Sequence, residues 1–142
     1  MKSVVLGIAL ASAGVAAQQP SWFTVVGDPG SPQTDTVEVD AASAVAFESL
    51  RLVKLRVNRA SSRTAFDGKP YRSYYSTALL DCTEMKAWHR TLSLYAEPLW
   101  RGQLRIHEYS ESDGRSVAFA DMSMNPRDRL IRAACSVSLQ GK

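Results

Sequence analysis

Two cysteines, Cys82 and Cys135, carry the most obvious reactive chemistry in this chain of 142 residues. A free thiolate can act as a nucleophile, whereas two thiols in an oxidising compartment can pair as a disulfide. Cys82 ends a strand-like run that begins at Leu79, and Cys135 lies near the end of a helical pattern. An even number of cysteines in an exported chain favours a structural disulfide between them. Two free buried thiols are the alternative. A disulfide would remove both candidate nucleophiles.

Asp40 and Asp81 are carboxylates that could be paired for general acid–base chemistry. Each ends a strand-like run, where an aspartate more often accepts backbone hydrogen bonds in a turn. Serines are frequent, but the Gly-x-Ser-x-Gly spacing of a nucleophile elbow does not occur. We therefore expect no catalytic residue and no enzymatic activity.

His89 and His107 are the chain's two histidines. The alternation predicts that they lie on neighbouring strands, with His89 on the face opposite Trp88. Two imidazoles that approach each other could offer nitrogens to a haem or a metal, but a third ligand at zinc spacing is missing. We therefore interpret them as exposed sheet-face histidines that are weak haem candidates, and we expect no metal and no cofactor.

Basic residues concentrate in one strand and the loop that follows it. On the polar face of a sheet, Lys54 and Arg56 would project together and attract an acidic protein surface, a sulfated glycan or another polyanion. A solvated face, or an edge strand protected by its charges, is the alternative. Amphipathic aromatics could add an interface, although several of them must be core. They are Tyr71, Tyr74, Tyr75, Trp88, Tyr95 and Trp100. The candidate ligand-binding residues are Arg51, Lys54, Arg56 and Arg59.

The overall charge argues against a nucleic-acid partner. The chain has 17 basic and 14 acidic residues, a net charge of +3 that falls to +2 if Lys2 is removed with an export signal. A dedicated nucleic-acid binder has a much stronger basic field.

The N-terminus has the pattern of a cleavable signal peptide over residues 1–17. Lys2 precedes an apolar stretch, and Ala16-Ala17 provide the small residues of a cleavage site. The apolar stretch is too short to span a bilayer. No cysteine follows it, so we do not expect a lipoprotein. Residues 18–142 are predicted to form one domain that is periplasmic, secreted or at the cell surface.

The remaining pattern is that of strands followed by one helix. Apolar and polar residues alternate in several runs separated by turn signals such as Asp67-Gly68. A bulge near Leu52-Val53 would reconcile two phases of alternation. The predicted strands are Trp22–Val26, Thr36–Asp40, Leu50–Asn58, Tyr71–Cys82, Met85–Ala96, Gln103–Ser110 and a short one within Ser116–Ala120.

The C-terminal helix is predicted over Pro126–Val137. Asn125 is a suitable N-cap, Pro126 suits the first helical position, and Asp128 favours the positive end of the helix dipole. A short amphipathic helix is marginal in water and needs a sheet to pack on. A bridge from Cys135 to a strand end would clamp it there and add on the order of 4 kcal/mol in the chain-entropy model.

Several of these residues, in this order, resemble a known family. They are Trp22, Val39-Asp40 followed by Ser43, the Leu80-Asp81-Cys82 strand end, a basic and aromatic strand that ends at Tyr95, and Cys135. Together they are similar to the surface-adhesin E family of small exported proteins of Gram-negative bacteria. The resemblance spans about Trp22 to Val137. It implies an α+β fold in which a C-terminal helix packs on a single antiparallel sheet of about six strands, with a strand-to-helix disulfide.

The resemblance implies an adhesin that binds host matrix and serum proteins, with haem binding and dimer formation also linked to the family. The prototype is a lipoprotein, and this chain departs from it by lacking the lipid-attachment cysteine. We therefore expect an exported binding protein for a protein or polyanionic ligand. The alternative is a periplasmic structural or envelope-assembly protein that acts through self-association, such as a homodimer.

Overall fold

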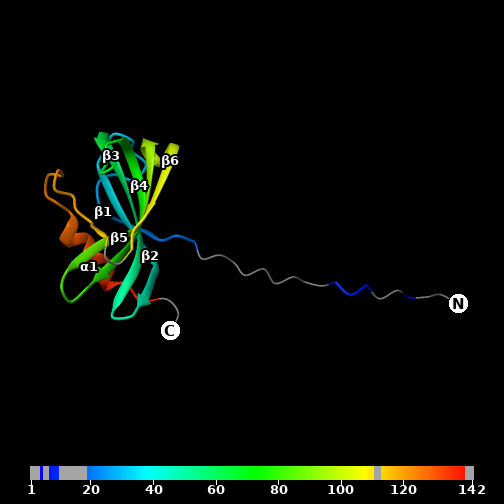
Figure 1. The fold of residues 1–142 in the computed structure, drawn as a ribbon. Coiled ribbons are helices and arrows are strands. Elements are labelled where there is room, and N and C mark those ends of the chain that lie inside the picture. Colours follow the sequence, from blue (N-terminus) through cyan, green and yellow to red (C-terminus); the bar gives the residue numbers. More distant parts are fainter. Residues whose placement is uncertain (1–3, 5–6, 10–18, 111–112, 140–142) are drawn as a thin grey trace.

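A computed structural model describes residues 4, 7–9, 19–110 and 113–139, and within them a single antiparallel sheet dominates the fold (Figure 1). Six strands follow one another across the sheet in chain order, so that each pairs with its sequence neighbours. A seventh short strand, β7 (Arg115–Ser116), pairs with β5. The six are β1 (Trp22–Val26), β2 (Thr36–Phe47), β3 (Leu50–Thr64), β4 (Pro70–Asp81), β5 (Lys86–Glu97) and β6 (Arg101–Glu108).

The predicted helix is present as α1 (Arg127–Ser136), one residue shorter at each end than expected. The prediction of Asn125 as the N-cap is wrong by one residue, because the helix begins at Arg127 and Pro126 occupies the N-cap position without a side-chain cap. Asn125 Oδ1 accepts a hydrogen bond from the Arg127 amide at 3.0 Å, one residue before that position. Leu130, Ile131 and Ala134 are fully buried on one side of the helix. Burying a leucine or isoleucine side chain stabilises a fold by about 1.5–3 kcal/mol, so this face holds α1 on the sheet.

We call the sheet face that α1 covers the inner face and the opposite one the outer face. The inner face carries the core, which includes Val39, Leu55 and Leu94. Val117, Phe119 and Met122, from the segment between β7 and α1, are buried in the same core. Alternation therefore sorts each central strand into an apolar inner row and a mostly polar outer row.

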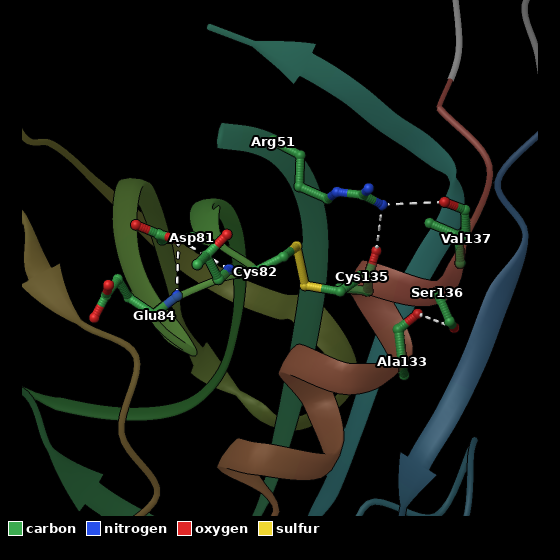
Figure 2. Close-up of a disulfide and its surroundings, with 10 residues drawn as sticks. Arg51, Asp81, Cys82, Glu84, Ala133, Cys135, Ser136 and Val137 are labelled. Atoms are coloured by element: carbon green, nitrogen blue, oxygen red, sulfur yellow. Dashed lines mark hydrogen bonds between the residues drawn. A yellow bond between two sulfur atoms is a disulfide. The ribbon is translucent and has the colours of Figure 1, made fainter. Parts of the chain in front are cut away.

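The predicted disulfide is confirmed. Cys82 lies directly after β4 and Cys135 lies in the last turn of α1, and their sulfur atoms are bonded across 53 residues of chain (Figure 2). The alternative of two free thiols is thereby excluded. Asp81 Oδ1 accepts hydrogen bonds from the amides of Thr83 and Glu84, each at 3.0 Å, which shapes the turn beside the bridge.

A second connection joins the same end of α1 to the sheet. The Arg51 guanidinium donates hydrogen bonds to the carbonyls of Ala134 and Val137, both at 3.0 Å, and Figure 2 shows it beside the disulfide. Carbonyls at a helix C-terminus lack intrahelical partners, and a cation there also complements the helix dipole. Arg51 is therefore part of the helix clamp.

The predicted bulge at Leu52-Val53 is wrong in its position. Pairing between β2 and β3 jumps from Asp40–Lys54 to Val45–Leu52, so the extra residues belong to β2. The pairing of β3 with β4 continues without a break through Leu52 and Val53. The Ser43 hydroxyl accepts a hydrogen bond from the Lys54 amide at 2.8 Å and donates one to the Asp40 carbonyl at 2.7 Å. These bonds satisfy backbone groups that the interrupted ladder leaves unpaired.

A second bulge, in β5, reverses part of the predicted inside–outside pattern. The pairing with β4 passes from Thr91 directly to His89, which leaves Arg90 as the extra residue. Ala87 and His89 consequently lie on the inner face with Leu92. The prediction that grouped Trp88 with Leu92 and put His89 on an exposed face is wrong, because one inserted residue inverts the phase of every residue before it.

Candidate binding surface

The four basic residues predicted to bind a ligand do not form one patch. Lys54 and Arg56 lie two residues apart on the outer face, whereas Arg51 joins the helix clamp on the other side. Arg59 is only 3% exposed and ion-pairs with Asp35 at 3.1 Å and Asp121 at 2.8 Å. The positive charge of Arg59 is thus used within the fold, and Lys54 and Arg56 are the two that the outer face presents.

Arg56 is held from three sides. Its Nε and Nη2 atoms donate to the two carboxylate oxygens of Glu38 at 2.7 Å and 3.2 Å. Its guanidinium carbon lies 4.2 Å from the ring centroid of Trp22 and 4.3 Å from that of Trp100. A two-point ion pair between two stacked indoles combines charge-assisted hydrogen bonds with cation–π attraction. Arg56 therefore connects Glu38 with the rings of Trp22 and Trp100.

Four aromatic side chains surround this arginine, and we call them the aromatic cluster: Trp22, Tyr75, Tyr95 and Trp100. The Tyr75 ring is central, with its centroid 6.1 Å from Trp22, 5.3 Å from Trp100 and 6.0 Å from Tyr95. The Trp100 indole nitrogen donates to the Tyr74 carbonyl at 3.1 Å, which fixes that ring as well. All four side chains remain partly exposed. The cluster is therefore a preformed and accessible aromatic surface.

A hollow of about 290 Å³ lies beside the aromatic cluster, and we call it the hydroxyl groove. It is lined by Lys54, Tyr75, Ser76, Thr77, Thr91 and Ser93. Lys54 is exposed, and among the described residues the structure gives it no ion pair. Glu108 pairs with Thr91 across β5 and β6 and is exposed too, so the charge here is mixed. The groove offers hydroxyl donors and acceptors together with one free cation.

The two histidines have separate partners on the inner face. His89 is 7% exposed, and its Nδ1 atom shares a hydrogen bond of 2.5 Å with the Ser76 hydroxyl. Burial lowers the pKa of His89 to about 4, so the imidazole is neutral at neutral pH. His107 is half-buried, with Nε2 3.3 Å from Asp67 Oδ2. Their use as a haem pair stays a prediction.

Asp67 lies next to His107 and forms an ion pair with Arg105. Two hydrogen bonds from Arg105, at 2.8 Å and 3.1 Å, hold the pKa of Asp67 down to about 2. The residues described here contain no group of three or more histidine, cysteine, aspartate or glutamate side chains that could hold a metal ion. Asp67 and Arg105 thus fasten the β3–β4 turn to β6.

The carboxylates considered for acid–base chemistry serve the backbone. Asp40 Oδ1 accepts hydrogen bonds from the amides of Ser21 at 2.8 Å and Ala42 at 3.1 Å. Asp81 holds the turn beside Cys82, as described above. Both observations confirm the structural interpretation of these aspartates.

Residues of the aromatic cluster were only partly visible in the sequence. Tyr75, Tyr95 and Trp100 were among the amphipathic aromatics, but Trp22 was noted only for its family resemblance. The partner of Arg56 was missed, although Glu38 and Arg56 both lie on polar phases of alternating runs. That shared phase was the signal that could have placed them on one face.

The fold and this surface define a class: a small α+β domain in which one disulfide fastens a helix to a sheet that has a partly exposed aromatic cluster on its other face. The family model of surface-adhesin protein E matches residues 22–136, and the chain belongs to that family. No curated protein and no solved structure matched the chain in the same comparisons. Within the described residues, no helix has the length and apolar composition needed to cross a membrane.

Proposed function

We propose that this chain is an exported, non-catalytic binding protein that attaches to a protein ligand through the outer face of its sheet. The observation that carries the proposal is the aromatic cluster, held in place around Arg56 and bordered by the hydroxyl groove. Family membership supports an adhesin-like role at the cell surface.

The aromatic cluster suits protein binding for energetic reasons. Tyrosine, tryptophan and arginine are enriched at the centres of interfaces. Tyrosine and tryptophan also bury much area at a small cost in side-chain entropy. Contacts among Trp22, Tyr75 and Trp100 restrict these rings before any ligand arrives. Prior restriction lowers the ordering cost of binding.

The charge of the face favours a protein over a polyanion. Glu38 neutralises Arg56, and the exposed Glu108 borders the groove, so Lys54 is the one unpaired cation among the described groove residues. Binding of a polyanion depends on many cations acting together and weakens steeply with salt. A protein surface with one acidic group opposite Lys54 fits this mixed chemistry better.

Export is part of the proposal. Residues 1–17 would be removed as a signal peptide, most of which lies outside the described residues, and residues 18–142 would form the mature domain without a lipid anchor. Surface proteolysis of intact cells, combined with cell fractionation, tests this location. Protection of the domain from added protease in intact cells would contradict an adhesin role.

Binding is tested with the mature protein on immobilised extracellular-matrix and serum proteins. Tyr95→Ser and Lys54→Ala should each weaken capture, and Lys69→Ala, in a turn outside the hydroxyl groove, is the matched control. Arg56 is not substituted, because its loss would leave the buried Glu38 carboxylate without its ion-pair partner. Capture that is equal in the parent and both outer-face variants would overturn the proposal.

Self-association is a second candidate because of β6. This strand is at the edge of the sheet, and it exposes Leu104 (44%) and Ile106 (58%) on the outer face. An exposed apolar edge strand can pair with another copy. Sedimentation should then show a dimer that Ile106→Lys dissociates, whereas a monomer at high micromolar concentration would exclude this alternative.

A further inference from the structure

A second hollow lies on the inner face, where the sheet is covered by loop segments. It has a volume of about 240 Å³ and sits between residues 64–66 and residues 115–118. Its wall includes Phe66, Tyr71, Tyr74, His89 and Leu92. We call it the inner cavity. None of its lining residues belongs to the aromatic cluster or the hydroxyl groove.

The wall combines aromatic and aliphatic side chains with polar ones, which suits a ligand that has both a flat ring and a polar group; the polar residues are Thr64, His89, Arg115 and Ser116. The ring centroids of Tyr71 and Tyr74 lie 5.9 Å apart. The His89 and Tyr74 rings meet edge to face, with 5.9 Å between their centroids. Aromatic rings prefer tilted or offset neighbours at such separations. Phe66 is 42% exposed, which leaves a large apolar side chain at the entrance.

His89 supplies one of the polar groups in this wall. Its Nδ1 atom is occupied by Ser76, whereas the described residues provide no hydrogen-bond partner for Nε2. Nε2 is therefore available for a hydrogen bond to a ligand or to water. Burial keeps the imidazole neutral, so it can serve a ligand by hydrogen bonding without adding charge.

Arg115 supplies a cation at the entrance. Its guanidinium carbon lies 4.6 Å from the Phe66 ring centroid, and its side chain is exposed. Arg115 interacts with the Tyr109 hydroxyl, and the structure gives it no ion pair with a described carboxylate. Asp67 is ion-paired with Arg105. An arginine fork binds a carboxylate at two points, which makes a carboxylate its natural ligand group.

We propose that the inner cavity binds a small aromatic carboxylate, with the ring against Phe66, Tyr71 and Tyr74 and the carboxylate at Arg115. The size fits one ring: a dry apolar cavity of about 150 Å³ holds benzene, and drug-sized ligands fill pockets of about 300 Å³ or more. At about 240 Å³ the inner cavity accommodates a ring with a short substituent. This site shares no lining residue with the outer-face surfaces, although Ser76 of the hydroxyl groove hydrogen-bonds His89 of the cavity wall.

The test uses benzoate and its neutral analogue benzamide as probes, with binding followed by chemical-shift changes in the folded, disulfide-bonded protein. Benzoate should shift the His89 ring signals in a saturable way. Arg115→Gln should weaken benzoate by about tenfold, the loss expected for one charge-assisted contact, and leave benzamide unchanged. Arg101→Gln, an exposed arginine outside the cavity, is the matched control.

A filling variant tests the location separately. Ala118 lines the cavity and is exposed, so Ala118→Phe adds bulk where the core is not packed. It should abolish binding of both probes. Saturable binding that survives in a folded Ala118→Phe, equal losses of both probes in Arg115→Gln, or no shift with millimolar benzoate would each overturn the proposal. If Ala118→Phe does not fold, the Arg115→Gln comparison alone decides.

Discussion

Glu38 and Arg56 form a two-point ion pair across β2 and β3, and the Arg56 guanidinium lies against the rings of Trp22 and Trp100. The Glu38 side chain is 3% exposed and the Arg56 side chain 19%, so water screens the pair only in part. Breaking such a pair costs stability, because the loss of either partner leaves the other as a largely buried charge without a counter-ion.

Glu38→Gln should therefore destabilise the protein by about 2–3 kcal/mol. Removing the carboxylate also frees the guanidinium that holds the two indoles, so tryptophan fluorescence should change before unfolding. Urea unfolding measures the stability, with Glu84→Gln, an exposed turn residue, as control. In the double variant Glu38→Gln, Arg56→Met the two losses should not add. Strict additivity would contradict coupling between these residues.

Loss of the disulfide should lower stability by about 2–4 kcal/mol. Cys82→Ser combined with Cys135→Ser removes it without leaving a reactive thiol. Thermal unfolding of this variant should match that of the reduced parent protein. Identical midpoints for the oxidised parent and the variant would show that the bridge does not stabilise the fold.

Arg51→Met should cost about 1–3 kcal/mol, the usual loss for a hydrogen bond to a charged group. The reason is that the carbonyls of Ala134 and Val137 would lose their shared donor. Lys54→Met, on the same strand, is the matched control because Lys54 has no such contact. Hydrogen exchange in α1 should rise in the first variant only. Unchanged exchange in both would exclude the capping role.

Stability should fall as pH decreases from about 6.5 to about 4. His89 has a pKa of about 4 in the folded protein, whereas an unfolded histidine titrates near its ordinary value. Between these values the unfolded state binds one more proton, so stability rises with pH and the total change is about 3 kcal/mol. His89→Gln should flatten this part of the profile measured by urea unfolding. An equally steep profile in the variant would assign the effect to another group.

The sequence predicted most of the fold because its strongest signals are local. Turns such as Asp67-Gly68 separate the strands, and consecutive strands in the sheet are neighbours in the chain, so alternation and punctuation suffice. Cys82 and Cys135 supplied the long-range connection. The predicted assignment of side chains to the two faces of the sheet was wrong where a strand contains an extra residue. Arg90 in β5 is such a residue, and it places His89 on the inner face, which a regular two-residue period cannot predict.

The candidate site was less predictable because its partners are distant in sequence. Arg51 bonds to Ala134, 83 residues away, and Arg59 to Asp121, 62 residues away. Local charge density made both look like surface residues. Lys54 and Arg56 were grouped correctly on one face, since that relation depends only on the two-residue period of a strand.

The order of the strands has a consequence for how the protein acquires its structure. Because each main strand pairs with the one before it, the sheet can form as successive hairpins whose partners are close in the chain. Hairpins form in microseconds, whereas oxidation of a cysteine pair takes seconds or longer. The native pairing of Cys135 with Cys82 requires α1 to lie on the sheet. We therefore expect the disulfide to form last, after the sheet and α1 have packed together.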